Sequence, residues 1–150
     1  MTHQKKDLLA ACYQVVNQRI GVVEKALKNA QEAANQETKS SAGDKYETGR
    51  AMMHLEKEKL SGQMSEVLKM KQALDMISAD KTYETAALGA YVRTAQAQYF
   101  ISASVGKIDL NGQAVFAISP VSPIGQQLLD KKAGDTLRFG GKAIEILEVS

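Results

Sequence analysis

The chain has 150 residues, of which 44% are hydrophobic and 24% charged, a composition that excludes a disordered chain and a membrane protein. Its 19 basic and 17 acidic residues leave a net charge of +2, which by itself indicates no nucleic-acid-binding surface. One cysteine, Cys12, and two histidines can form neither an intramolecular disulfide nor a convincing zinc site. We find no signal-peptide segment and no run of about 18 apolar residues, and therefore expect a cytoplasmic protein without a membrane partner.

Helix-forming residues dominate the first half of the chain, and residues 1–80 contain no proline. Apolar residues recur there in alternating steps of three and four, the pattern of a helix that packs on one partner helix. The first such seam is Leu9, Tyr13, Val16, Ile20, Val23, Leu27, Ala30 and Ala34. The second is Met53, Glu56, Leu60, Gln63, Val67, Met70, Leu74 and Ile77, of which six are apolar. A Ser- and Gly-containing segment separates the two seams. We therefore expect an antiparallel coiled-coil hairpin over residues 1–79, with its tip near residues 39–47.

Turn and strand formers dominate residues 80–150, which contain both prolines and most of the glycines and aromatic residues. We expect strands within residues 88–94, 98–103, 113–118, 136–139 and 143–149. Asn111-Gly112 predicts a tight turn, and Ser122-Pro123 predicts the start of a short helix. The chain is thus expected to have an α+β fold, in which a helical hairpin is followed by a small β-rich domain at 80–150.

Two acidic residues, Asp44 and Glu47, stand where the second long helix is expected to begin. Their spacing favours a capping box, in which Asp44 is the N-cap and Glu47 the third helical residue. The same spacing also places both carboxylates on one side of the helix, where they could bind part of the coordination shell of Mg²⁺. Two carboxylates cannot hold that ion alone, so the second interpretation requires the active site of another protein.

Two segments resemble the Gre family of transcript cleavage factors, which bind bacterial RNA polymerase. The first segment is residues 119–135, in which a Ser, then Ser-Pro-aliphatic-Gly, two aliphatic residues and Gly-Asp follow at the spacing of the family's C-terminal signature. The matching residues are Ser119, Ser122, Pro123, Ile124, Gly125, Leu128, Leu129, Gly134 and Asp135. The second segment is Gly43-Asp44-Lys45-Tyr46-Glu47, which is similar to the Gly-Asp-x-x-Glu tip of the family.

This resemblance implies an FKBP-like C-terminal domain and a hairpin that enters the secondary channel of RNA polymerase. Asp44 and Glu47 would hold an Mg²⁺ shared with the polymerase, whose own site cleaves backtracked RNA. The protein would then be a monomeric accessory factor of core polymerase, with no catalytic activity and no cofactor of its own. Lys45 and Arg50 would approach the 3′ end of the nascent RNA.

The segment Ser122, Pro123, Ile124 and Gly125 would contact the polymerase. The alternative interpretation is that these residues only begin a helix.

Two other functions stay open at this stage. Thr48-Gly49 stand where the family has Asn-Ala, which leaves a regulator that enters the channel without stimulating cleavage as the alternative. An FKBP-like domain also suggests a peptidyl-prolyl isomerase. That activity needs an aromatic-lined pocket, and this chain has no tryptophan and few other aromatic residues.

Overall fold

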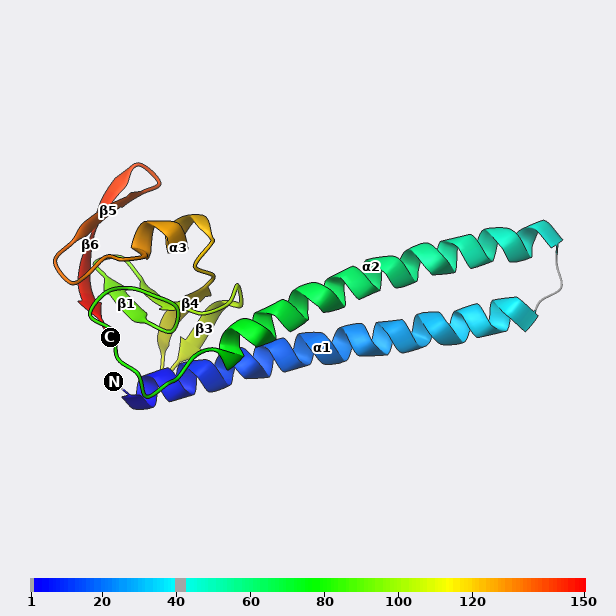
Figure 1. Cartoon of the computed structure of the whole chain (residues 1–150), viewed down its shortest axis with the longest axis horizontal. Coiled ribbons are helices and arrows are strands. Elements are labelled where there is room, and N and C mark those ends of the chain that lie inside the picture. Colours follow the sequence, from blue (N-terminus) through cyan, green and yellow to red (C-terminus); the bar gives the residue numbers. More distant parts are fainter. Residues whose placement is uncertain (1, 40–42) are drawn as a thin grey trace. The chain divides into compact units, whose positions relative to one another are not determined.

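A computed structural model describes residues 2–39 and 43–150, with side chains described for 4–36 and 49–150. Two long helices, α1 (Thr2–Lys39) and α2 (Gly43–Asp75), precede a six-stranded sheet with one short helix, α3 (Pro123–Leu128) (Figure 1). The expected α+β class is therefore confirmed. By its contacts the chain divides into two compact units: a helix unit, Asn17–Lys69, and a sheet unit, Met1–Val16 with Met70–Ser150. The expected boundary at residue 80 follows the change of secondary structure, whereas the compact units divide within the helices.

The helix unit consists of the parts of α1 and α2 that lie side by side in Figure 1. Within it the α1 seam is as expected, with Val23 and Ala30 buried. In α2 the expected seam is wrong at two positions, because Glu56 and Gln63 are exposed. Half-buried Lys57 and Met64 take their places, so that the α2 seam is Met53, Lys57, Leu60, Met64 and Val67. This register keeps Leu60 and Val67 buried and leaves the Glu56 carboxylate and the Gln63 amide exposed to solvent.

The first turns of α1 belong to the sheet unit and bury residues that lie outside the seam. Leu8 and Cys12 are fully buried, and Cys12 Sγ lies 4.0 Å from Ser102 Oγ, directly after the second strand. Further towards the N-terminus, Lys5 Nζ donates to the Lys81 carbonyl oxygen at 2.6 Å and lies 4.8 Å from the centre of the Tyr83 ring. This part of α1 therefore packs on its own unit as well as along α2.

Six strands form the sheet in the order β3-β4-β2-β1-β6-β5. The β2–β4 pair is parallel, and the other neighbours are antiparallel. In chain order the strands are β1 Tyr91–Thr94, β2 Gln98–Ile101, β3 Gly106–Leu110, β4 Gln113–Ile118, β5 Thr136–Phe139 and β6 Lys142–Val149. The strand β3 was not among those expected, because its charged Lys107 and Asp109 alternate around a single buried residue, Ile108.

The main core of the sheet unit lies on the face that carries α3. Register places Val92 opposite Tyr99 and Ile101 beside Ile118, while Tyr91 and Phe100 point to the other face. Val92 and Ile101 form one buried cluster with Leu128 of α3. Leu137 and Ile144 from the β5–β6 hairpin complete that side of the cluster. The short helix is thus held on the sheet by buried Leu128, with half-buried Ile124 packed against the same cluster.

Burial of Cys12 predicts an unreactive thiol. Burial raises the pKa of the Cys12 thiol to about 11 from its ordinary value of 9.0, and the contact with Ser102 only partly opposes this. Because the folded state holds the thiol proton more tightly, this contribution to stability is complete below pH 9 and is lost as pH rises towards 11. At pH 8 we expect alkylation of Cys12 by iodoacetamide to be about a hundredfold slower in the native protein than in urea. Equal rates in the two states would contradict this burial.

Candidate functional site

The two acidic residues of the predicted tip lie in the first turns of α2. The helix α1 ends at Lys39 and α2 begins at Gly43, so Asp44 and Glu47 come from the start of the second helix and, being three apart, lie on one side of it. Residues 40–42 and the side chains of Asp44, Lys45 and Glu47 lie outside the part of the chain that the structure describes. The structure therefore places the backbone of these residues at the beginning of α2.

The backbone corrects the expected capping box. An N-cap residue has a non-helical backbone, whereas Asp44 is already helical because α2 begins one residue earlier, at Gly43. Asp44 and Glu47 therefore do not stand at the N-cap and third positions of α2. A carboxylate in the first turn of a helix is still stabilised by the helix dipole, by about 0.3–1 kcal/mol. The capping interpretation of this pair is thus replaced by a weaker electrostatic one.

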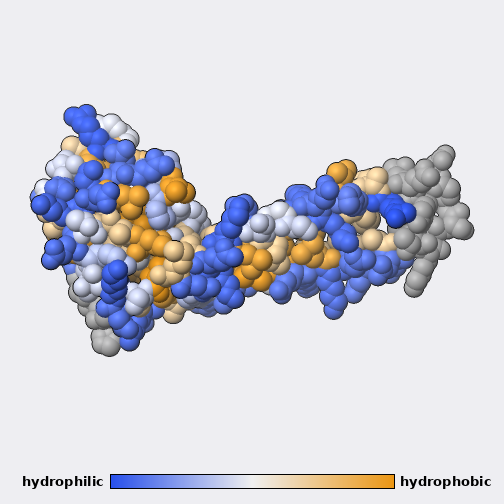
Figure 2. Space-filling view, in the orientation of Figure 1, coloured by the Kyte–Doolittle hydropathy of each residue, from blue (hydrophilic) through white to orange (hydrophobic). Residues whose placement is uncertain are grey.

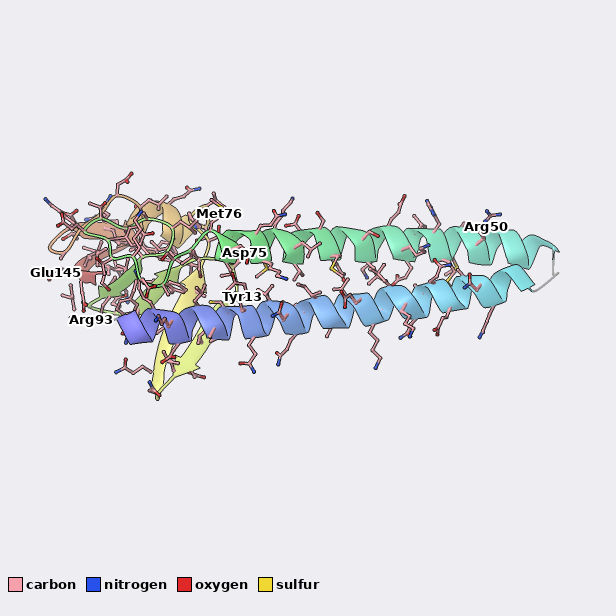
Figure 3. The ribbon with its side chains drawn as sticks, turned by 60° about the horizontal axis from the view of Figure 1, so that its bottom comes forward. Tyr13, Arg50, Asp75, Met76, Arg93 and Glu145 are labelled. Atoms are coloured by element: carbon pink, nitrogen blue, oxygen red, sulfur yellow. The ribbon has the colours of Figure 1, made fainter. Side chains whose placement is uncertain are left out.

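Of the two basic residues expected near the RNA, the structure describes the side chain of one. Arg50 is exposed on α2, three residues beyond Glu47, and Figure 3 shows it near the beginning of that helix. Arg50 therefore lies on the same stretch of helix as the acidic pair, whereas the Lys45 side chain lies outside the described residues.

The predicted docking segment forms a tightly bonded turn before α3. Ser122 is the N-cap of α3, and its Oγ accepts a hydrogen bond from Gly125 N at 3.1 Å and donates one to the Ser119 carbonyl oxygen at 2.7 Å. Ser119 Oγ in turn accepts from Val121 N at 3.2 Å. Both serines of the signature therefore have a structural role in this turn, and the helix-start interpretation is confirmed for Ser122.

Gly125 is buried against the Ser119 carbonyl oxygen of the same turn. A Cβ at this position would lie 2.1 Å from the Ser119 carbonyl oxygen and 2.9 Å from Ser122 Oγ. Real Cβ atoms do not approach a backbone oxygen so closely, so only glycine fits here without moving the turn. Gly125 thus explains why serine, serine and glycine occur together at this spacing.

This clash predicts a strong effect of Gly125→Ala. We expect the substitution to destabilise the sheet unit by about 2–4 kcal/mol, because the backbone of the turn must shift and lose its two serine hydrogen bonds. Gly62→Ala is the matched control. A Cβ there meets nothing within 4 Å, and alanine should stabilise α2 by about 0.5–1 kcal/mol. Chemical denaturation followed by amide exchange measures both variants. An unchanged sheet unit in Gly125→Ala would show that the turn adapts.

The exposed surface around the docking segment is formed by side chains other than those of Ser122 and Gly125. Pro123 is exposed and Ile124 is half-buried, whereas Val121, which the sequence reasoning did not single out, is 77% exposed. On β4, directly before this segment, the ring of Phe116 is 37% exposed and lies 6.1 Å from that of Tyr99. Figure 2 shows apolar side chains gathered on this unit. Val121 could have been found from the sequence as the apolar residue between Pro120 and the N-cap.

No other cluster in the described residues offers metal or membrane chemistry. Among residues 4–36 and 49–150, no group of three or more His, Cys, Asp or Glu side chains could hold a metal ion. His54, the histidine whose side chain is described, is exposed and lies 3.2 Å from Glu58 one turn along α2. Neither long helix, as far as it is described, contains an apolar stretch sufficient to cross a membrane.

Comparison with known proteins gives a loose structural likeness. No protein-family model and no curated protein matches the chain. Among solved structures, the chain is similar to that of the transcription factor Gfh1, with 17% sequence identity, coverage of 93% of each chain and a TM-score of 0.37. A likeness as loose as this assigns no activity to the chain.

Proposed function

We propose that this protein is a Gre-like factor that binds RNA polymerase through its secondary channel and stimulates cleavage of backtracked RNA by the polymerase. The protein acts as a monomer and supplies no catalytic site of its own. The sheet unit docks on the polymerase, and the tip of the helix pair carries the residues that act on the reaction. The nascent RNA 3′ end is the second partner, met inside the complex.

The observation that carries the proposal is the joint occurrence of two motifs in the elements that each would need. Ser119, Ser122 and Gly125 form one hydrogen-bonded turn at the head of α3, which supports treating residues 119–135 as a built motif rather than a chance match. Gly-Asp-x-x-Glu stands at the head of α2, directly after the break between the two long helices. A resemblance confined to either motif would support the proposal less.

The donor chemistry of the tip fits a shared Mg²⁺. Asp44 and Glu47 are hard oxygen donors on one side of α2, and two carboxylates leave most of an octahedral shell to other ligands. The polymerase is therefore required to complete the site. When bound, the ion supplies the charge stabilisation of two-metal phosphoryl chemistry. Asp44 would be a ligand of that ion, directly or through water, and Glu47 would support the same ion or orient the attacking water. Lys45 and Arg50 would approach the 3′ end of the nascent RNA.

Docking is assigned to the exposed residues around the turn. Pro123 and Val121 are exposed beside half-buried Ile124, so they can contact a partner without disturbing the turn that Ser122 and Gly125 stabilise. An apolar contact of this kind needs a partner with an apolar or aromatic surface.

A second candidate function is favoured by one observation. Thr48-Gly49 follow Glu47 where the family has Asn-Ala, and the change lies in the turn of α2 directly after the acidic pair. A factor that enters the channel and inhibits or modulates the polymerase without cleavage would share every other feature. Its signature is tight binding to core polymerase with no acceleration of cleavage.

The experiment that tests the proposal separates docking from chemistry. Residues 40–48 are replaced by a short Gly-Ser turn, and both co-purification with core polymerase and cleavage of backtracked RNA are measured. We expect binding to persist and cleavage to fall to the rate of polymerase alone, since docking is assigned to the sheet unit. Loss of binding would overturn that division, and retained cleavage would remove the tip from the reaction.

A further inference from the structure

A group of polar side chains bridges α1 and α2 at the exposed edge of their apolar contact. The Lys57 side chain is half-buried at a seam position, and its Nζ donates a hydrogen bond across the pair to Gln31 Oε1 at 2.6 Å. Gln31 Nε2 donates in turn to Asn35 Oδ1 at 3.0 Å, one turn further along α1. Gln31 is therefore held by an ammonium donor on one side of its amide and by an oxygen acceptor on the other.

A second polar contact joins the same two helices inside the sheet unit. Tyr13 Oη donates to Asp75 Oδ1 at 2.5 Å, and Figure 3 shows both residues where α1 and α2 face each other. Tyr13 lies 18 residues before Gln31 in α1, and Asp75 lies 18 residues after Lys57 in α2. Each contact therefore joins positions of α1 and α2 that are equally far along the sequence from residue 44.

The apolar seam residues alone specify this register weakly. Val16, Val23 and Ala30 recur every seven residues on α1, and Leu60 and Val67 do so on α2. Within the helix unit, a slip of seven residues would bring similar apolar side chains into contact again. It would also separate Lys57, a half-buried seam residue, from its hydrogen-bond acceptor Gln31. A polar residue at a seam position is known to select one register of a coiled coil at some cost in stability.

We infer that the group of Lys57, Gln31 and Asn35, together with the contact of Tyr13 with Asp75, selects the axial register of the helix pair and thereby which residues form its tip. Asp44 lies midway in the sequence both between Gln31 and Lys57 and between Tyr13 and Asp75. A slip of seven residues would move this midpoint by three to four residues along the sequence. Lys57 is thus a positioning residue. The register itself follows from the contacts above, and its consequence for cleavage rests on the proposed function.

The test measures the register directly with spin labels. Labels are attached at Glu32→Cys and Glu66→Cys, both exposed positions of the helix unit, in the full chain with Cys12→Ala. We expect one distance in the otherwise unchanged protein. Lys57→Met should keep its helicity and thermal midpoint but gain a second distance, since a slip of seven residues slides the helices by about 10 Å. Adding Tyr13→Phe should enlarge this second population.

Two controls keep the inference falsifiable. Lys59→Met removes an exposed lysine from the same helix and should leave one distance, while Lys57→Arg retains a donor and should restore the single population. A single unchanged distance in Lys57→Met with Tyr13→Phe would overturn the inference. Loss of helicity in Lys57→Met alone would also overturn it, because the lysine would then be a stabilising contact rather than a selector of register.

Cleavage of backtracked RNA by the same variants separates this inference from the proposed function. Slipped variants should lose cleavage in proportion to the second population. Full cleavage by a slipped variant would refute the link between register and tip. Absence of cleavage in the unchanged protein would refute the proposed function, but it would not change what the spin-label distances show about the register.

Discussion

Asp44→Asn is expected to reduce polymerase-dependent RNA cleavage by about a hundredfold or more, with little change in the stability of the protein. The substitution keeps the size of the side chain and removes the negative charge that a shared Mg²⁺ requires. Asp44 is helical in α2, so the expected loss of stability is limited to its interaction with the helix dipole, about 0.3–1 kcal/mol. Single-round cleavage of backtracked complexes and thermal unfolding measure the two effects on one variant.

The controls for Asp44→Asn come from the same helix. Glu47→Gln should also lower cleavage, and extra Mg²⁺ should restore part of the activity of each variant. Glu56→Gln removes an exposed carboxylate further along α2 and should leave cleavage unchanged. Full cleavage by Asp44→Asn, with polymerase binding retained, would remove Asp44 from the reaction and favour the non-cleaving regulator.

Leu60→Asp is expected to unfold the helix unit while the sheet unit stays folded. Leu60 is 6% exposed in the contact between α1 and α2, and the substitution would place an unpaired carboxylate there at a cost of about 3–5 kcal/mol. Val23→Asp, at a position 7% exposed on α1, should act in the same way. Amide hydrogen exchange resolves the two units. We expect fast exchange throughout Asn17–Lys69 and continued protection of the strands.

Gln63→Asp is the matched control for Leu60→Asp, because the two positions lie three residues apart on one helix. Gln63 is exposed, although the seam expected from the sequence included both Glu56 and Gln63. An aspartate there should cost only a few tenths of a kcal/mol in helix propensity. Equal loss of protection in Leu60→Asp and Gln63→Asp would contradict the seam that the structure shows.

Periodicity predicted the existence of both long helices, but it did not decide which residues of α2 face α1. Two registers of α2 share Met53, Leu60 and Val67 and differ at the positions between them. One register places Glu56 and Gln63 in the contact, and the other places Lys57 and Met64 there. Lys57 is acceptable because Gln31 on α1 accepts its hydrogen bond, and such a partner is visible only once the helices are paired. The choice therefore depends on the tertiary contact rather than on the pattern of one helix.

The candidate site was predictable to a similar degree. The signature located the turn before α3, but it did not separate Ser122 and Gly125, which build the turn, from exposed Pro123 and Val121, which can meet a partner. That distinction needs the positions of the Ser119 carbonyl oxygen and of the backbone that passes it. The spacing of Asp44 and Glu47 indicated a capping box, which requires the helix to begin at a particular residue. The helix begins one residue earlier.

We expect this protein to accelerate the RNA cleavage of the polymerase through the tip of its helix pair. The most direct measurement is the rate of cleavage of radiolabelled RNA in backtracked complexes of core polymerase, with and without the protein, at a concentration where co-purification shows binding. We predict an increase of about a hundredfold or more over polymerase alone, which Asp44→Asn with Glu47→Gln abolishes without loss of binding. Saturating binding with no increase in the cleavage rate would contradict the claim.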